Sequence, residues 1–78
     1  MTVGGVIWTS DAERDLLAMP PSEAERVLDE VESFATTGRG FVRQMLDGSY
    51  YQRLYVERYY IVFDFDGVEL TVHSVRPR

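Results

Sequence analysis

The period of the hydrophobic residues changes near Gly38–Gly40, and this change constrains the fold more than any other feature of the sequence. Upstream of it, apolar residues recur every three to four positions, as on one face of an α-helix. Downstream of it, apolar and polar residues alternate with a period of two, as in half-buried strands. The 78 residues are enough for one domain, spanning 1–78. The pattern predicts an α+β fold in which helices precede most of the strands.

The start of the chain predicts a strand followed by a short helix. A β-branched and aromatic run predicts the strand over residues 4–9. Ser10 stands three residues before Glu13, which is the spacing of a capping box. A helix is therefore expected over 11–18. Pro20-Pro21 ends it, because proline disfavours a helical conformation in the residue before it.

A second helix is expected to follow at once, which makes a helical hairpin with a tight Pro-Pro elbow. Ser22 and Glu25 repeat the capping-box spacing, and Gly38 suits the left-handed residue that follows many helix ends. One face of this helix is apolar and is predicted to face the core, through Ala24, Val27, Leu28, Val31, Phe34 and Ala35.

Three strands are predicted at the end of the chain, over 50–56, 59–65 and 68–75. Glu57-Arg58 separates the first two, and Asp66-Gly67, which favours a type I′ turn, separates the last two. Consecutive hairpins of this kind predict an antiparallel meander. The expected order is β-α-α-β-β-β, a small twisted antiparallel sheet with a helical hairpin packed on one face.

The stretch between the helices and these strands has a weaker pattern. Phe41-Val42 and Met45-Leu46 are short apolar pairs that fit either a brief strand or a turn. Asp47-Gly48 is a turn signal. No internal repeat, low-complexity segment or linker interrupts the chain.

The charged residues are unevenly distributed along the chain. All eight basic residues are Arg, against thirteen acidic ones, which gives a net charge of −5. Residues 1–35 carry eight acids and two arginines, a net of −6, whereas residues 36–78 carry five acids and six arginines, a net of +1. Nucleic-acid binding depends on clustered cations that neutralise phosphates, so the overall charge argues against it. A surface that meets an anion is expected only in the second half.

Several classes of protein are excluded by what the sequence lacks. Without cysteine there is no disulfide, thiol nucleophile or zinc–thiolate site. The first residues have neither the basic region nor the apolar run of a signal peptide. No stretch approaches the roughly 18–20 apolar residues of a membrane span. We expect a cytoplasmic protein with no membrane association, no cofactor and no metal ion.

Three segments, taken in order along the chain, resemble the RelE/ParE toxin superfamily. The opening segment 8–12, WTSDA, leads into two helices, as it does in that family. Residues 52–63, QRLYVERYYIVF, look like its central hairpin, in which a basic strand turns tightly into a Tyr-Arg pair. The ending 72–78, VHSVRPR, is similar to its last strand, which closes on a basic residue. The resemblance covers nearly the whole chain and implies the same α+β fold.

The resemblance implies the toxin of a type II toxin–antitoxin pair, with one of two activities. RelE-like members cleave mRNA on the ribosome with basic residues on the concave sheet face, whereas ParE-like members inhibit DNA gyrase. Both are held inactive by an antitoxin that wraps the toxin. The implied partners are a cognate antitoxin together with either ribosome and mRNA or DNA gyrase, and a homodimer is a further option.

Matched by position, the resemblance assigns Arg53 to a basic residue of the family's second strand and Arg78 to the basic residue that ends its last strand. Tyr59 matches the Tyr of the Tyr-Arg pair, but Tyr60 stands where an active-site Arg is expected. Tyr51 falls where RNA-cleaving members often carry a basic residue. The sequence ends at Arg78, without the C-terminal extension that supplies a further catalytic residue in that family. We therefore expect a reduced active surface.

RNA cleavage through the 2′-hydroxyl needs a base, an acid and positive charge near the phosphorane. Arg53 and Arg78 would supply the charge. Tyr60 or the sole histidine, His73, would carry protons, since imidazole titrates nearest neutral pH. The candidate catalytic residues are therefore Arg53, Tyr60, His73 and Arg78.

Each candidate also has a structural interpretation. His73 could be a half-buried strand residue, Arg53 could stack on Tyr51 and Tyr55, and Arg78 could belong to a solubilising tail. The five tyrosines could form a base-stacking platform or a protein interface, and the acidic chain favours the interface.

Two functional classes stay open. The first is a toxin that inhibits growth, either as an mRNA endoribonuclease or as a gyrase inhibitor. The second is a non-catalytic protein-binding module on the same scaffold that has lost toxin activity. Tyr60 and the net charge argue against the ribonuclease, and whether the chain is an enzyme stays undecided.

Overall fold

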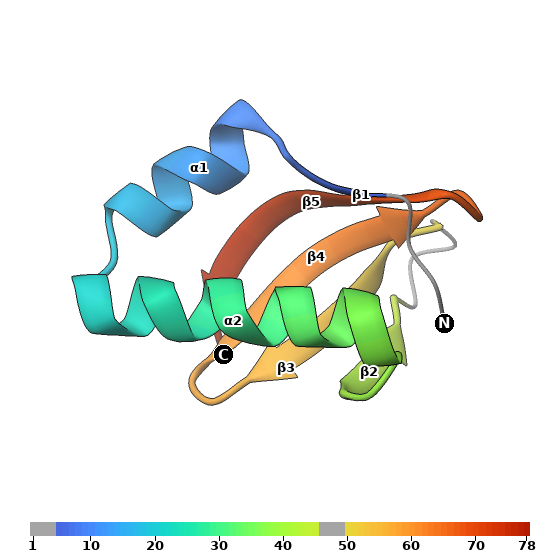
Figure 1. The fold of residues 1–78 in the computed structure, drawn as a ribbon. Coiled ribbons are helices and arrows are strands. Elements are labelled where there is room, and N and C mark those ends of the chain that lie inside the picture. Colours follow the sequence, from blue (N-terminus) through green and yellow to red (C-terminus); the bar gives the residue numbers. More distant parts are fainter. Residues whose placement is uncertain (1–4, 46–49) are drawn as a thin grey trace.

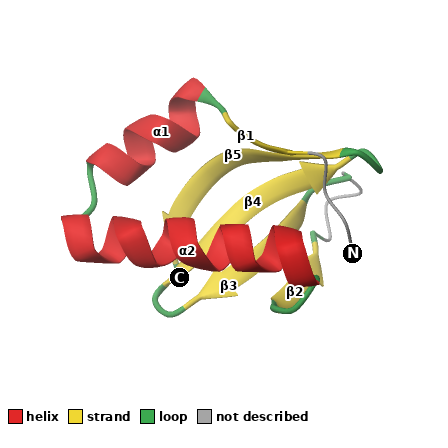
Figure 2. Ribbon diagram, in the orientation of Figure 1, coloured by secondary structure: helices red, strands yellow, loops and turns green. Residues whose placement is uncertain are grey.

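The computed structural model describes residues 5–45 and 50–78 and confirms the α+β fold with two helices on one face of a sheet (Figures 1 and 2). The turn predicted at Asp47-Gly48 and the first residue of the 4–9 strand lie outside the described residues. The elements are β1 Gly5–Trp8, α1 Ser10–Leu17, α2 Pro21–Thr37, β2 Phe41–Gln44, β3 Gln52–Val56, β4 Tyr59–Phe65 and β5 Glu69–Pro77.

The sheet has five strands in the order β1-β5-β4-β3-β2. Neighbours from β3 to β5 are antiparallel, as the consecutive hairpins predicted. β2, which the sequence left open between a brief strand and a turn, is a fifth strand and pairs antiparallel with β3. β1 instead pairs with β5 in parallel, so the sheet is mixed and differs at this edge from the expected antiparallel one. A parallel pair needs a long crossover, here both helices and three strands, and local sequence patterns carry no signal for such a distant partner.

α1 begins one position earlier than the capping box predicted. The hydroxyl of Thr9, not Ser10, caps the helix by accepting the N–H of Ala12 at 3.2 Å. Both residues carry a hydroxyl that can cap, and Thr9 is the one with the extended backbone that a capping residue needs.

α2 also begins differently from the prediction. It starts at Pro21 without a side-chain cap, so Ser22 lies inside the helix. Proline suits the first helical position because its fixed φ is already helical and its missing N–H has no partner there. The predicted end is confirmed, since Gly38 is left-handed at φ 74° and donates its N–H to Phe34 O at 2.8 Å. No helix within the described ranges is long and apolar enough to cross a membrane.

The hairpin between β4 and β5 has a different turn from the one expected. Within this turn only Gly67 has a positive φ, 99°, whereas a type I′ turn needs a positive φ at both central residues. The carboxylate of Asp66 accepts the N–H groups of Val68 and Glu69 at 2.8 and 2.7 Å, and the loop is therefore centred one residue later. This shift moves every pairing between β4 and β5.

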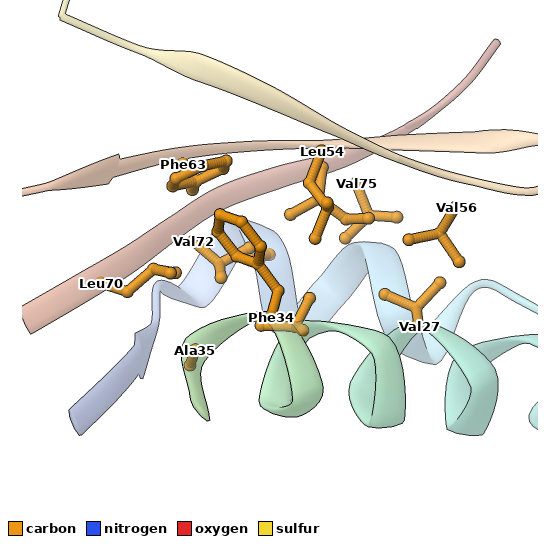
Figure 3. Packing of buried hydrophobic residues seen from close by; sticks show 12 residues of the cluster. Val27, Phe34, Ala35, Leu54, Val56, Phe63, Leu70, Val72 and Val75 are labelled. Atoms are coloured by element: carbon orange, nitrogen blue, oxygen red, sulfur yellow. The ribbon is translucent and has the colours of Figure 1, made fainter. Parts of the chain in front are cut away.

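The core lies between α2 and the sheet (Figure 3). Of the six residues predicted to face it from α2, four are buried and Ala24 and Leu28 are partly buried. Phe34 meets Phe63 edge to face, with ring centroids 5.4 Å apart. The sheet contributes Leu54, Val56, Ile61, Phe63, Leu70, Val72 and Val75. Removing this apolar surface from water is the main contribution to stability.

A β-bulge interrupts the strict alternation that was expected in the last strand. The register between β4 and β5 shifts between Val62 and Phe63, which leaves His73 as an extra residue in β5. Val72 and Val75 on either side of the bulge are consequently both buried in the core. His73 is turned to the opposite face.

Candidate functional site

The candidate site occupies the sheet face that points away from α1 and α2, here called the open face (Figure 1). Side chains alternate along each strand, so the neighbours of buried Leu54 and Ile61 point to this face. They include Arg53 on β3 and Tyr60 on β4. All four predicted catalytic residues lie on the open face.

Three aromatic rings cross the open face from β2 to β4 and form what we call the aromatic row: Phe41, Tyr55 and Tyr60. These residues are direct cross-strand partners. The rings of Phe41 and Tyr55 meet at 5.4 Å between centroids, and those of Tyr55 and Tyr60 at 6.2 Å. Phe41 is 56% exposed, although apolar rings are normally buried. The row therefore has one largely exposed apolar ring, Phe41, at its β2 end.

Each ring of the aromatic row has a guanidinium group over it. Arg43 lies 5.1 Å from the centroid of Phe41, Arg53 lies 5.0 Å from that of Tyr60, and Arg78 lies 4.8 Å from that of Tyr55. Arg53 thus stacks on Tyr60 across the hairpin, not on Tyr51 or Tyr55 of its own strand. A guanidinium group stacked in this way can still use its in-plane N–H groups for hydrogen bonds, as Arg78 does with Glu57 O at 3.0 Å.

Arg43 and Arg53 also face each other directly across β2 and β3. Like charges at directly opposed positions destabilise a sheet. Together with Gln44, Met45 and Tyr55 they line a depression of about 310 Å³. Two basic side chains therefore line this depression.

The other end of the open face holds a histidine–carboxylate pair. His73 Nε2 lies 2.5 Å from Asp64 Oδ2, and the two side chains are 31% and 32% exposed. The ring of Tyr51 packs against the imidazole at 4.8 Å between centroids. The pair is therefore fixed in position and yet reachable by a ligand on the open face.

Residues of α1 hold the bulge that carries His73. β1 ends at Trp8, so the next stretch of β5 lacks a neighbouring strand on that side. Thr9 supplies the hydrogen bonds that a neighbouring strand would make there. Its hydroxyl donates to His73 O at 3.2 Å, and its N–H donates to Val72 O at 3.1 Å. Asp15 Oδ2 accepts the N–H of Val75 at 2.9 Å. α1 thus satisfies the backbone on both sides of the bulge.

The tip of the β3–β4 hairpin is fastened to α2 by ion pairs. Arg58 lies 3.3 Å from Glu23, and Arg26 lies 3.5 Å from Glu57. Burial, followed by the negative charge and hydrogen bond of Glu23, raises the pKa of the Tyr59 hydroxyl, which Arg58 opposes. These pairs are largely exposed and each contributes at most about 1 kcal/mol.

Arg78 holds the same hairpin tip from the open face. Its guanidinium donates to Glu57 O at 3.0 Å, and its backbone N–H donates to Arg58 O at 2.7 Å. Glu57 has a positive φ of 52°, which is uncommon for a residue other than glycine. Arg78 is therefore an integrated part of the sheet, in contrast to the solubilising tail considered from the sequence.

The four predicted residues fall into two groups. Arg53, Tyr60 and Arg78 belong to the aromatic row or lie against it, and His73 lies at the other end of the open face. Arg53 lies on β3, two residues after Tyr51, whose ring packs against His73. Two residues of extended chain span about 7 Å.

The sequence analysis missed Asp64 as the partner of His73, and Arg43 and Phe41 as members of the site. Alternation along β4 already put Asp64 on the same face as Tyr60. Its pairing with His73 could not be found, because it depends on the shifted turn and the bulge.

A second hollow, of about 350 Å³, lies between the elbow of the helical hairpin and the end of β5. Met19, Pro20 and Pro77 make much of its lining apolar. Its carboxylate, Asp15, is already used by the backbone of β5. The open face is therefore the stronger candidate for chemistry.

No protein-family model matches the sequence, and no curated protein matches it. Solved structures do resemble the fold. A chain of the toxin–antitoxin complex RelBE2 from Mycobacterium tuberculosis superposes with a TM-score of 0.78 at 17% identity, covering 99% of this chain and 100% of that one. A chain of the RelB–RelE antitoxin–toxin complex from Methanococcus jannaschii gives 0.75 at 17% identity, over 92% and 89%. The YoeB dimer from Staphylococcus aureus gives 0.75 at 11% identity, over 95% of each chain. This chain therefore has the fold of the RelE-type toxins.

Proposed function

We propose that the chain is the toxin of a toxin–antitoxin pair and that it acts on its target through the open face. The fold supports the first part, because the similar structures include RelB–RelE and RelBE2 complexes of a toxin with its antitoxin. A cognate antitoxin is accordingly the expected partner. The second part rests on the side chains of the open face.

The observation that carries the proposal is the opposed pair Arg43 and Arg53 beside the aromatic row. Proteins bind single-stranded nucleic acid by combining a cationic groove for phosphates with aromatic rings for bases. The depression combines two arginines with one ring of the aromatic row, Tyr55. We therefore propose RNA as the target in preference to DNA gyrase, and growth inhibition through translation.

The net charge of −5 is a weaker argument against an RNA target once the charged residues are located in the structure. Eight of the thirteen acids lie in residues 1–35, which form β1, α1 and most of α2. The open face carries Arg43, Arg53 and Arg78. The Arg that Tyr60 replaces also has a substitute, because Arg53 reaches over the Tyr60 ring from β3.

Induced expression in a bacterial host tests the proposal. We expect growth arrest with the unmodified chain, and relief of the arrest by Arg53→Ala and by Arg78→Ala. Arg14→Ala is the matched control, since this exposed arginine of α1 lies away from the open face. Normal growth at a high level of folded protein would contradict the toxin and favour the non-catalytic binding module.

The target is tested on the purified protein. We expect it to stop a reconstituted translation reaction and to leave the supercoiling reaction of DNA gyrase unchanged. The opposite result would replace RNA by gyrase as the target and leave the toxin proposal in place.

A further inference from the structure

We propose that Asp64 and His73 form the proton-transfer pair of this toxin, with His73 as the catalytic base and Asp64 as a positioning residue. The inference rests on the proposed function, specifically on RNA as the target. It assigns a role to Asp64, whose carboxylate lies 2.5 Å from His73 Nε2 on the open face.

The bulge in β5 allows His73 to lie on the open face while Val72 and Val75 both remain in the core. Without the extra residue, strict alternation would place either Val72 or Val75 on the open face, and His73 would have different neighbours. With it, both valines stay in the core and the imidazole reaches Asp64. The hydroxyl of Thr9 donates a hydrogen bond to the carbonyl oxygen of His73, which also holds the backbone that carries the imidazole. Bulges commonly re-aim a side chain at a functional position.

The hydrogen bond to Asp64 determines which nitrogen of His73 can act. An ionised carboxylate only accepts hydrogen bonds, so Nε2, which faces Asp64, carries the proton in the neutral imidazole. The lone pair is then on Nδ1. Asp64 thereby selects the tautomer and stabilises the imidazolium that forms when Nδ1 takes a second proton.

The resulting step is balanced without a co-reactant. Nδ1 takes the proton of a ribose 2′-hydroxyl while the 2′-oxygen bonds to the adjacent phosphorus. The bond from phosphorus to the 5′-oxygen breaks, that oxygen keeps the electron pair, and it takes a proton from solvent. The products are a 2′,3′-cyclic phosphate and a 5′-hydroxyl end. The imidazolium then returns its proton to solvent.

The spacing of the open face fits this division of labour. Val62 pairs with Arg53 on one side and with Ser74 on the other, so Arg53 lies two strands across the sheet from His73 and one position along it. The row that contains Tyr51 and Asp64 is about 7 Å from the row of Arg53. A phosphate held by Arg43 and Arg53 would leave the neighbouring ribose near the imidazole. The arginines would hold the RNA strand while His73 moves the proton at the neighbouring nucleotide.

The experiment uses the full chain and a 5′-labelled oligoribonucleotide, presented alone and as the message of a reconstituted translation reaction. We expect His73→Ala to lower kcat by at least about 100-fold while KM stays within about threefold. Asp64→Asn should lower kcat by about tenfold or more, and Asp64→Glu should recover part of the loss. Ser74→Ala, next to His73 in the bulge, is the matched control and should retain full activity.

Binding is measured separately with a DNA oligonucleotide of the same sequence, which lacks the 2′-hydroxyl. We expect His73→Ala, Asp64→Asn and the unmodified chain to bind it with the same Kd, which shows that the variants are folded. Should His73→Ala fail to bind, His73→Gln, which keeps a polar side chain of similar size, replaces it in the assay.

The outcomes separate the inference from the proposed function. Cleavage by His73→Ala or by Asp64→Asn at the rate of the unmodified chain would overturn the inference and leave an RNA-cleaving toxin. Growth arrest without any RNA cleavage would overturn the inference and leave a toxin with another target. If His73→Ala or Asp64→Asn raised KM and left kcat unchanged, the pair would be a binding site. That result would overturn its role in proton transfer.

Discussion

The two faces of the sheet are built from different side chains by the same alternation along each strand. The core face carries aliphatic residues and phenylalanine, and the buried residues include no polar or charged side chain among those described. The open face carries tyrosine, arginine, histidine and aspartate. The side chains of the core and those of the candidate site thus lie on opposite sides of a single layer of backbone.

The bulge in β5 is where the two faces depend on each other. It lets Val72 and Val75 both reach the core, and the same extra residue brings His73 to Asp64. The contacts that hold it come from Thr9 and Asp15 beside α1. Residues at the bulge therefore affect both faces. Substitutions on each face and at the bulge can measure how independent the two faces are in stability and in function.

The largest loss of stability is expected from the core face. Phe63→Ala should lower the free energy of unfolding by about 3–5 kcal/mol, because it removes a buried ring that packs on Phe34. Urea unfolding measures the loss. Tyr55→Ala removes a ring of the open face and should cost clearly less; equal losses for the two variants would remove the distinction between the faces.

A smaller loss is expected at the bulge. Asp15→Ala should lower the free energy of unfolding by about 1–3 kcal/mol, since the N–H of Val75 loses the carboxylate that accepts it at 2.9 Å. Asp11→Ala, on the exposed side of α1, should stay within about 0.5 kcal/mol. If Asp15→Ala is as stable as this control in urea unfolding, then α1 does not hold the bulge.

On the open face, function should change more than stability. Arg53→Ala should lower the free energy of unfolding by less than about 1 kcal/mol, the range of an accessible cation–π contact. Binding to a labelled oligoribonucleotide should weaken, and its dependence on the logarithm of the salt concentration should become less steep by about one. Fluorescence anisotropy over a salt series measures both. An unchanged slope would indicate that Arg53 contacts no phosphate.

The smallest effect concerns the turn that sets the register of β5. Hydrogen bonds from the backbone N–H groups of Glu69 and Val68 lower the pKa of Asp66 below its ordinary value. Because the folded-state pKa is the lower one, Asp66 contributes stability at neutral pH that is lost as the pH falls below about 4 and through the folded-state pKa. Asp66→Asn keeps the accepting oxygen but does not titrate, and it should flatten the acid limb of the stability curve. Parallel curves for the two proteins in urea unfolding would contradict the assignment.

Local patterns predicted a large part of the fold. The apolar face of α2, its end at Gly38 and the two hairpins each depend on residues close together in the sequence. The starts of α1 and α2 were misplaced, because Thr9 competes with Ser10 as a cap and Pro21 needs none. The parallel pair of β1 and β5 joins segments more than 60 residues apart, and no local signal reports it.

The candidate site was predictable as a face but not as a set of contacts. Alternation placed Arg53 and Tyr60 on their faces, and the tight turn between β3 and β4 brought those faces together. The neighbours of His73 depend on a one-residue shift in the turn at Asp66 and on the bulge. The turn shift and the bulge each change which residues of β4 and β5 face each other, but neither changes the hydrophobic pattern. The sequence alone therefore could not predict the contact between His73 and Asp64.

The uneven charge distribution has a consequence for how this protein meets a polyanion. Residues 1–35, which form β1, α1 and most of α2, have a net charge of −6, and Arg43, Arg53 and Arg78 lie on the open face, so the two sides of the sheet differ in charge. If RNA is the target, as proposed above, the field of an RNA strand would orient a protein with this charge difference during diffusion. Repulsion of the helices and attraction of the arginines favour encounters in which the open face arrives first. An acidic protein can in this way associate rapidly with an acidic polymer, at a rate that falls as salt is added.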